Sequence, residues 1–263
     1  DAIVVGSGIS GGWAAKELCE KGLKTLVLER GRDVQHLKDY PTMTASVWDM
    51  PHRNQIPRED KMKNPVVNRC YAYKEDTEHF FVKDSDHPYV QEKPFDWIRG
   101  YQVGGKSLIW ARQTQRWSAY DFEGPGRDGF AVDWPIRYED VAPWYSYVER
   151  FVGISGSYEG LDTLPDGEFL PAWEMNCVEK EIQQRVNQSY QDRKFIKGRC
   201  AHLTQPNAQH LAQGRGQCMA RNQCYRGCPF GGYFSSNSST LPSSNSIILS
   251  LEASSSSRCE LAF

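Results

Sequence analysis

The sequence predicts an α/β fold built on a parallel sheet, and the signal for it is concentrated in the first residues of the chain. A short apolar run at 2–5, long enough for a buried strand, leads into the glycine-rich segment 6–12. Helix-forming residues follow over 13–21, Gly22 is placed to end that helix, and a second apolar strand is expected at 25–29. This order of strand, glycine turn, helix and strand is typical of a doubly wound parallel sheet.

The composition is that of a globular chain and excludes several function classes. The 263 residues are 39% hydrophobic and 12% aromatic, which is enough to build a hydrophobic core. The net charge of -2 gives no reason to expect nucleic acid as a partner. A mean hydropathy of -0.63, with no apolar run approaching the length of a membrane-spanning helix, predicts no transmembrane segment.

The spacing Gly6-x-Gly8-x-x-Gly11 between strand and helix is typical of a dinucleotide-binding turn. Gly6 permits the tight turn, Gly8 lets the backbone approach a pyrophosphate, and Gly11 lets the helix pack closely on the strand. The helix N-terminus adds N–H groups that favour phosphate, and Glu29 can accept hydrogen bonds from ribose hydroxyls. The alternative is a plain glycine turn beside an exposed glutamate. The pattern predicts a Rossmann-like nucleotide site without distinguishing NAD from FAD.

The rest of the chain is less regular. Residues 51–79 are rich in proline and charged side chains, and we expect a long surface excursion with little regular structure. Apolar spacing predicts helices over 138–151, where Pro143 is expected to kink or delay the helix, and over 175–190. Twelve of the 23 residues over 235–257 are serine, which predicts a linker or disordered segment that buries little surface.

A second glycine-rich element spans 99–110 (RGYQVGGKSLIW), and the segment 134–136 (WPI) leads into the helix expected at 138–151. With the first glycine turn, these segments resemble the glucose-methanol-choline (GMC) flavoprotein oxidoreductases from Asp1 to about Pro242. The resemblance implies a Rossmann-like FAD-binding domain with long irregular excursions. It also implies that the second glycine element passes the flavin pyrophosphate and the isoalloxazine ring.

Two positions depart from the family pattern. Lys106 stands where small residues are usual, and Trp110 stands where asparagine or histidine is common. The family branch with covalent flavin carries a histidine next to that tryptophan, whereas this chain has Ile109, so the resemblance implies noncovalent FAD. The residues that the resemblance assigns to FAD are Gly6, Gly8, Ser10, Gly11, Gly12, Glu29, Arg30, Gly104, Gly105, Ser107 and Trp110.

Cys218, Cys224 and Cys228 form a Cys-x5-Cys-x3-Cys-Pro array in a glycine-rich segment. Three arginines lie nearby with no acidic residue between 213 and 232, a local charge that favours thiolates over thiols. Thiolates this close in sequence can converge on one inorganic centre. The array therefore predicts a metal site.

The spacing by itself leaves three chemistries open. Three thiolates suit a [3Fe-4S] cluster, zinc would take a fourth ligand from His210, Cys200 or His202, and an oxidising compartment would allow one disulfide and a thiol. One GMC branch, the catalytic subunits of bacterial sugar and sugar-acid dehydrogenases, has a similar array that binds a [3Fe-4S] cluster. The resemblance implies the same role here, with electrons leaving the flavin through the cluster.

The resemblance implies hydride transfer to FAD from an alcohol carbon of a sugar, polyol or sugar acid, with a histidine as base. In the family this histidine follows the cysteine array, whereas the last histidine here is His210. We therefore assign no catalytic residue and expect an incomplete form with the substrate domain largely missing. The expected parts are an FAD-binding region over 1–242 and a serine-rich, disordered or non-native tail over 243–263.

The resemblance also implies partners and a compartment. A small subunit and a c-type cytochrome would accept the electrons, and the periplasm would be the location. The alternative function is an inactive nucleotide-binding remnant whose cysteine array holds a structural zinc ion or a disulfide. Bound flavin together with iron would distinguish the enzyme from the remnant.

Overall fold

The computed structural model describes residues 1–244 and 246–250, and within them the chain forms two compact units. Unit 1 comprises Asp1–Ala111, Ala220–Gly231 and Ser235–Phe263, and unit 2 comprises Arg112–Met219 and Gly232–Phe234. Each unit is described by itself. No helix in the described residues is long and apolar enough to cross a membrane.

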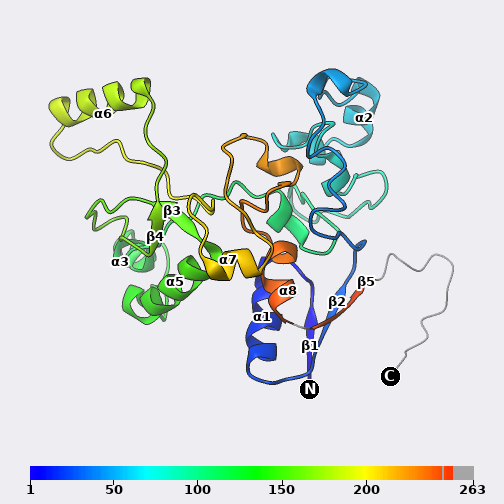
Figure 1. The fold of residues 1–263 in the computed structure, drawn as a ribbon, viewed down its shortest axis with the longest axis horizontal. Helices are drawn as coiled ribbons and strands as arrows, with labels where there is room; N and C mark the ends of the chain where they lie inside the picture. The colour runs from blue at the N-terminus through cyan, green and yellow to red at the C-terminus, as the bar shows by residue number, and fades with distance from the viewer. Residues whose placement is uncertain (245, 251–263) are drawn as a thin grey trace. The chain divides into compact units, whose positions relative to one another are not determined.

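Unit 1 contains a three-stranded parallel sheet in the order β1-β2-β5, shown in Figure 1. The predicted strands and helix at the N-terminus are confirmed: β1 is Ala2–Val5, α1 is Ile9–Glu20 and β2 is Thr25–Glu29. Helix α1 begins earlier than expected because its first turn includes part of the glycine segment. Gly22 follows the helix with a φ of +85°, the left-handed conformation that ends many helices.

The sheet is covered on the face that carries alternate residues of its strands. Val4 and Val27 are buried against Ala15 of α1, whereas Ile3 and Val5 are 67% and 83% exposed. The expectation of a buried strand at 2–5 therefore holds for one face only, because α1 packs on one face among the described residues. The third strand, β5, is Ile247–Ser250 and pairs with β2.

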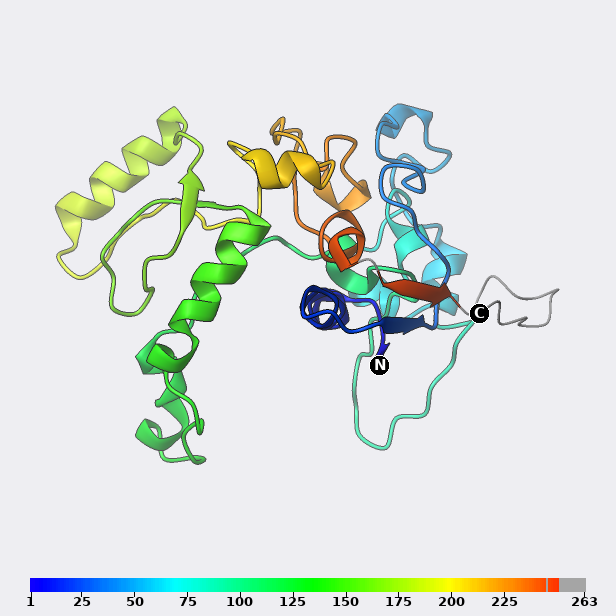
Figure 2. The ribbon, with the colours of Figure 1, turned by 60° about the horizontal axis from the view of Figure 1, so that its bottom comes forward.

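The serine-rich segment is largely a buried part of unit 1, so the prediction that it buries little surface was wrong for 235–241. Ser236 and Thr240 are fully buried, and α8 (Thr240–Ser244) packs beside α1 in both Figures 1 and 2. The reason is side-chain size, since a Cβ on Gly12 of α1 would lie only 2.5 Å from Thr240 Oγ1. Of the predicted tail over 243–263, residues 245 and 251–263 lie outside the described residues.

The excursion after β2 contributes to the core of unit 1 and is not a surface feature. It contains α2 (Arg58–Lys63), and most of the remainder consists of turns, as expected. Its apolar side chains are buried in one hydrophobic cluster with residues that precede and follow it. The buried members of that cluster are Val34, Tyr40, Ile56, Val67, Tyr73, Phe80, Phe81 and Leu108.

The cysteine-bearing segment 220–231 packs on this excursion. Arg226 is 4% exposed and its Nε donates to the buried Asp76 carboxylate at 2.5 Å, while its Nη1 donates to the Ala45 carbonyl at 3.0 Å. A Cβ on Gly227 would lie 2.3 Å from Cγ of Tyr40, so only glycine fits there. These contacts fix one end of the segment against residues far away in sequence.

Unit 2 contains helices and a small parallel pair of strands, β3 (Ile154–Gly156) and β4 (Phe169–Pro171). The predicted helix over 138–151 is confirmed, and Pro143 lies inside it without delaying its start. The second predicted helix is also confirmed, beginning at Cys177 after Asn176, which caps it. The helices of unit 2 are α3 (Ala119–Phe122), α4 (Gly124–Arg127), α5 (Tyr138–Val152), α6 (Cys177–Ser189) and α7 (Ala208–Ala212).

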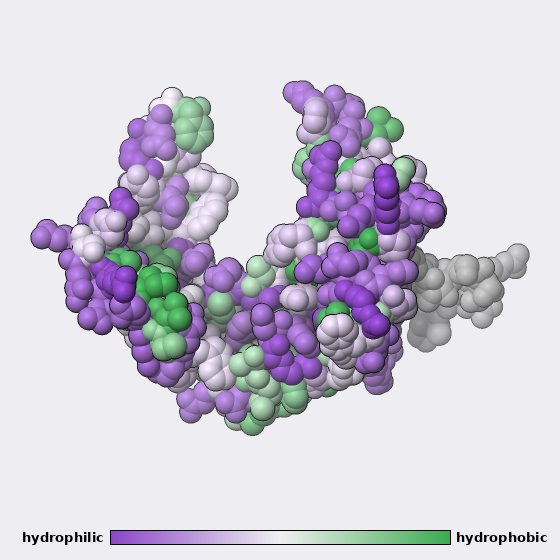
Figure 3. Space-filling model, turned by 90° about the horizontal axis from the view of Figure 1, so that it is seen from above, coloured by the Kyte–Doolittle hydropathy of each residue, from purple (hydrophilic) through white to green (hydrophobic). Residues whose placement is uncertain are grey.

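The surface agrees with the low mean hydropathy of the chain. Figure 3 shows a face on which hydrophilic side chains prevail and hydrophobic ones form small separate groups. Exposed apolar side chains include Val178 and Ile182 of α6, which are 62% and 40% exposed. The apolar spacing that predicted α6 therefore does not mark a buried face among the described residues.

The buried ion pair between Asp76 and Arg226 gives the first prediction. Asp76→Ala leaves the Arg226 guanidinium buried without its counter-ion, and we expect the free energy of unfolding to fall by about 3–5 kcal/mol. The control is Asp96→Ala, which removes an exposed pair with Arg69 and should cost about 0–1 kcal/mol. Urea unfolding followed by circular dichroism measures both. Equal small losses in the two variants would contradict the anchoring role of Asp76.

Candidate functional site

The glycine-rich loop between β1 and α1 has the geometry that its spacing predicts. Gly6 has a φ of +92°, which permits the turn out of the strand. A Cβ on Gly11 would lie 1.8 Å from the Gly6 carbonyl oxygen, so Gly11 is required for the close approach of helix and loop. A Cβ on Gly8 would meet no atom of the described residues within 4 Å and would point into open space. None of these residues requires glycine at that position for space, whereas a phosphate approaching the backbone would.

The start of α1 is suited to an anion. Gly8 is its N-cap and provides no side-chain hydrogen bond, and the first turn carries no acidic residue. The N–H groups at the start of a helix lack partners within the helix and carry a partial positive charge. Ser10 lies exposed in this first turn, where its hydroxyl can reach a bound ligand.

Glu29 is buried, in contrast to the exposed glutamate of the alternative reading. Its Oε2 accepts hydrogen bonds from the Ser7 amide, at 3.0 Å, and from the Ser7 hydroxyl. Its Oε1 accepts from the Gly31 amide at 3.0 Å. The carboxylate thus holds the glycine-rich loop to the end of β2. Because two carboxylate oxygens offer about four acceptor positions, Glu29 retains capacity for a ribose hydroxyl.

The structure brings the second glycine element against the first. The Gly104 amide donates to Ser7 Oγ at 3.0 Å, and a Cβ on Gly105 would lie 3.3 Å from Cα of Gly8. The hydroxyl of Ser107 accepts a hydrogen bond from the Ser236 amide at 3.0 Å, which also ties the serine-rich segment to this site. Residues about 100 apart in sequence therefore lie together within unit 1. We call this group the cradle; it includes Ser7, Gly8, Glu29, Gly104, Gly105 and Ser107.

Three further residues that the sequence assigned to the cofactor have defined positions. Arg30 is exposed beside Glu29, and its guanidinium lies 4.0 Å from the centre of the Tyr101 ring and donates to the Tyr101 hydroxyl at 3.0 Å. Gly12 is buried against the serine-rich segment, so its role is in packing. Trp110 is partly buried at the end of the second element.

Several residues of the cradle were missed by sequence reasoning. Ser7 is fully buried and is shared by Glu29 and Gly104. Asn237 lies against Gly104, where a Cβ on the glycine would be 3.2 Å from the amide, and its Nδ2 donates to the Val34 carbonyl at 3.2 Å. No local pattern indicates either role, because their partners are distant in sequence.

The cysteine array is divided between the two units. Cys218 belongs to unit 2, whereas Cys224 and Cys228 belong to unit 1, in or next to the short 3₁₀ turn Cys224–Arg226. Within the described residues, no group of three or more His, Cys, Asp or Glu side chains could hold a metal ion.

The arginines near the array all have partners far away in sequence. The charge of Arg226 is compensated by Asp76, which lies 150 residues earlier in the chain. Arg221 donates to the carbonyl of Met43 at 3.2 Å, and Arg215 donates to the carbonyl of Val152 at 2.9 Å. The inference of a local field that favours thiolates was wrong for Arg226, because an acidic residue outside the segment compensates its charge.

The two histidines that precede the array have structural surroundings. His210 is fully buried, its Nε2 lies 3.2 Å from the Arg150 carbonyl, and its Nδ1 accepts from the Asn207 amide at the start of α7. His202 is partly buried and pairs through its backbone with Tyr233. Burial lowers the pKa of both imidazoles, with the nearby guanidinium of Arg215 or Arg112 adding to the effect. Both side chains are therefore neutral near pH 7.

Substitutions of Gly8 and Gly11 should differ in their effect on stability, although both glycines belong to one motif. Gly11→Ala places a methyl group against the Gly6 carbonyl and should lower the free energy of unfolding by about 2 kcal/mol or more. Gly8→Ser introduces a favourable N-cap into open space and should leave stability unchanged within about 0.5 kcal/mol, or raise it. Thermal unfolding compares the two. A destabilised Gly8→Ser variant would show that this loop is packed differently.

Comparison with known proteins gives sequence relatives but no family match. A scan against protein-family models finds none that matches. The chain is 25% identical over 256 residues to the fructose dehydrogenase large subunit of Gluconobacter japonicus, covering 89% of this chain and 41% of that protein. It is 28% identical to the 2-methyl-1,2-propanediol dehydrogenase of Mycolicibacterium austroafricanum, covering 63% and 26% of the two chains. It is 29% identical to the oxygen-dependent choline dehydrogenase of Xanthomonas euvesicatoria pv. vesicatoria (strain 85-10), covering 62% and 25%.

A solved structure, an FAD-dependent oxidoreductase from Chaetomium thermophilum, aligns with 71% of this chain and 29% of its own, at a TM-score of 0.34 and 17% identity. That likeness is too low to bear on the fold. The chain spans less than half the length of the relatives named above. Those relatives are GMC-type oxidoreductases, in agreement with the resemblance seen in the sequence.

Proposed function

We propose that this chain contains the FAD-binding part of an oxidoreductase that oxidises an alcohol group of a small molecule. The observation that carries the proposal is the cradle of unit 1. In it, an uncapped helix N-terminus, the open space at Gly8 and the second glycine element at Gly104 and Gly105 lie together. The names of the relatives, which specify a sugar, a diol and choline, support a hydroxyl-bearing substrate.

Each part of the cradle has a role in holding FAD. The start of α1 would accept the pyrophosphate, because its N–H groups are available and Gly8 leaves room for the close approach. Glu29 would accept a ribose hydroxyl while it keeps the loop in place through Ser7. Arg30, stacked on Tyr101, would flank the adenosine end. Bound FAD supplies the two-electron acceptor for the hydride of the alcohol carbon.

No catalytic residue of this chain is part of the proposal. The role of base needs a group that reaches the substrate hydroxyl. His210 is engaged inside unit 2 by the Arg150 carbonyl and the Asn207 amide. The chain is therefore proposed to bind and orient the cofactor, and the activity of the whole protein is proposed by analogy with its relatives.

We propose further that Cys218, Cys224 and Cys228 bind an iron–sulfur cluster, of the [3Fe-4S] type, through which electrons leave the protein. The support is the Cys-x5-Cys-x3-Cys-Pro spacing and its resemblance to the sugar dehydrogenase branch. Within the described residues no group of three or more candidate ligand side chains is found, and no reaction step is derived from the cluster. A small subunit and a cytochrome would be the acceptors.

Flavin binding tests the main proposal. Gly8→Val places a branched side chain where the pyrophosphate would lie, without meeting protein atoms within 4 Å of its Cβ. We expect wild-type protein reconstituted with FAD to show the flavin absorption bands at a stoichiometry of about one, and the variant to show none. Gel filtration followed by absorption spectroscopy measures bound flavin.

Circular dichroism provides the control, since the variant should keep the secondary structure of the wild type. Lys106→Ala is a second control, because this exposed side chain reaches only the Ile98 carbonyl, at 3.3 Å. The Lys106→Ala variant should retain flavin. Wild-type stoichiometry in Gly8→Val would contradict the assignment of the cradle to FAD.

Metal analysis tests the cysteine array. Because serine lacks the soft thiolate that iron–sulfur chemistry prefers, Cys218→Ser, Cys224→Ser and Cys228→Ser should each lose iron and acid-labile sulfide. Cys200→Ser should keep both, because Cys200 lies 17 residues or more from the array. The measurements are iron and sulfide per chain on protein purified without air, with electron paramagnetic resonance of the oxidised form. One zinc per chain without sulfide would refute the cluster.

A further inference from the structure

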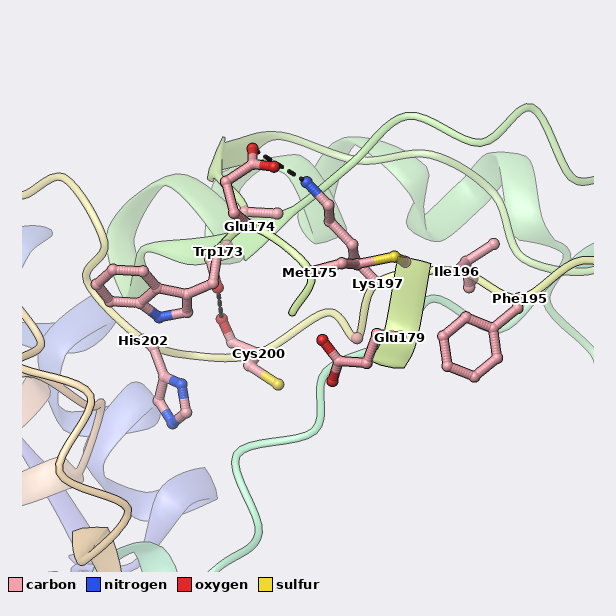
Figure 4. Close-up of a pocket in the computed structure, with 12 residues that line it drawn as sticks. Trp173, Glu174, Met175, Glu179, Phe195, Ile196, Lys197, Cys200 and His202 are labelled. Carbon is pink, nitrogen blue, oxygen red and sulfur yellow. Dashed lines mark hydrogen bonds and ion pairs between the residues drawn. The ribbon is translucent and has the colours of Figure 1, made fainter. Parts of the chain in front are cut away.

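Unit 2 contains a pocket that none of the roles above uses. Its volume is about 260 Å³, which suits a small molecule of a single ring. The walls come from the segment before α6, from the first turns of α6 and from the extended chain over 195–202, as Figure 4 shows. All of its lining residues belong to unit 2.

The pocket has one aromatic wall. Trp173 lines it with an indole that is 45% exposed, so a flat apolar surface is available to a ligand. In Figure 4 the indole lies on one side of Cys200 and the Glu179 carboxylate lies on the other. A ring with C–H groups on its face packs well on such an indole.

The charges in the pocket do not cancel. Glu174 pairs with Lys197 at 3.6 Å, which uses the one lysine among the lining residues. Glu179 has no ion-pair partner in the described part of the chain, and its Oε2 accepts only the Asn176 amide, at 2.8 Å. One negative charge at Glu179 is therefore left facing the pocket.

The side chains of Cys200 and His202, which also line the pocket, are uncharged. Burial lowers the pKa of His202 and raises the pKa of the Cys200 thiol, so both groups are neutral near pH 7. The guanidinium of Arg112 is close enough to act on both. A cation would therefore lie at Glu179, while the neutral imidazole and thiol can exchange hydrogen bonds with hydroxyl groups.

We propose that this pocket binds a small hydroxylated organic ammonium ion. Its ammonium group donates to the Glu179 carboxylate, its ring packs on Trp173, and a hydroxyl lies at Cys200 and His202. The site lies wholly in unit 2, so its occupancy does not depend on flavin in unit 1.

Two sugars of matched shape test the proposal, namely glucosamine, which carries an ammonium group near neutral pH, and glucose, which does not. Saturation-transfer difference NMR with the full chain gives the dissociation constant of each. We expect glucosamine to bind at least about tenfold more tightly than glucose, because only the amine compensates Glu179. Equal affinity of the two sugars, or binding of neither, would overturn the proposal.

Variants of the lining residues test whether glucosamine binds in this pocket. Glu179→Gln removes the charge, while a glutamine can still accept from the Asn176 amide at the helix start. It should weaken glucosamine binding by about tenfold and leave the weak binding of glucose unchanged. Glu181→Gln on the same helix is the control, since Glu181 is exposed and pairs with Arg185. Retention of the wild-type affinity in Glu179→Gln would contradict the site.

A second pair of variants serves if Glu179→Gln does not fold. Trp173→Ala should weaken the binding of glucosamine, because it removes the aromatic wall. Trp144→Ala should not, because Trp144 is an exposed residue of α5 and does not line the pocket. Equal effects of the two tryptophan variants would overturn the proposal.

Discussion

The buried carboxylate of Glu29 is the interaction on which the candidate site depends. It accepts hydrogen bonds from the amide and hydroxyl of Ser7 and from the amide of Gly31, so it holds the glycine-rich loop against the end of β2. The same Ser7 hydroxyl accepts from the amide of Gly104 and positions the second glycine element. A buried charge is tolerated only when it is hydrogen-bonded in this way. The loop, the strand end and the second element therefore form one structure, and a nucleotide would bind to a preformed cradle.

The long excursion and the serine-rich segment both support the parts of unit 1 near the candidate site. The excursion supplies Asp76, which compensates Arg226, and Tyr40, which precedes the excursion, packs on Gly227. Both contacts anchor the part of the cysteine segment that belongs to unit 1. The serine-rich segment places Ser236 against Ser107 of the second glycine element. Small side chains allow this close packing against α1. Segments that the sequence predicts to be irregular or disordered thus pack against the residues of the candidate site.

The sequence predicted the local features and missed the long-range ones. The bounds of β1 and β2 and the presence of α1 between them followed from apolar runs and glycine turns, which are encoded by neighbouring residues. The burial of Ser236 and the pairing of Arg226 with Asp76 could not be predicted, because each depends on partners more than 100 residues away. The prediction that the serine-rich segment buries little surface failed for the same reason. Composition indicates the average burial of a segment, but it does not show which other residues the segment packs against.

The central claim is that the cradle of unit 1 selects FAD, and calorimetric titration of the flavin-free chain with FAD, NAD⁺ and ADP tests it most directly. The loop and Glu29 can hold the ADP portion of either dinucleotide, so ADP should bind and compete with FAD. The second glycine element should add affinity for the flavin half alone. We predict that FAD binds one to one and more tightly than ADP, and that NAD⁺ binds no more tightly than ADP. Tighter binding of NAD⁺ than of FAD would contradict the account.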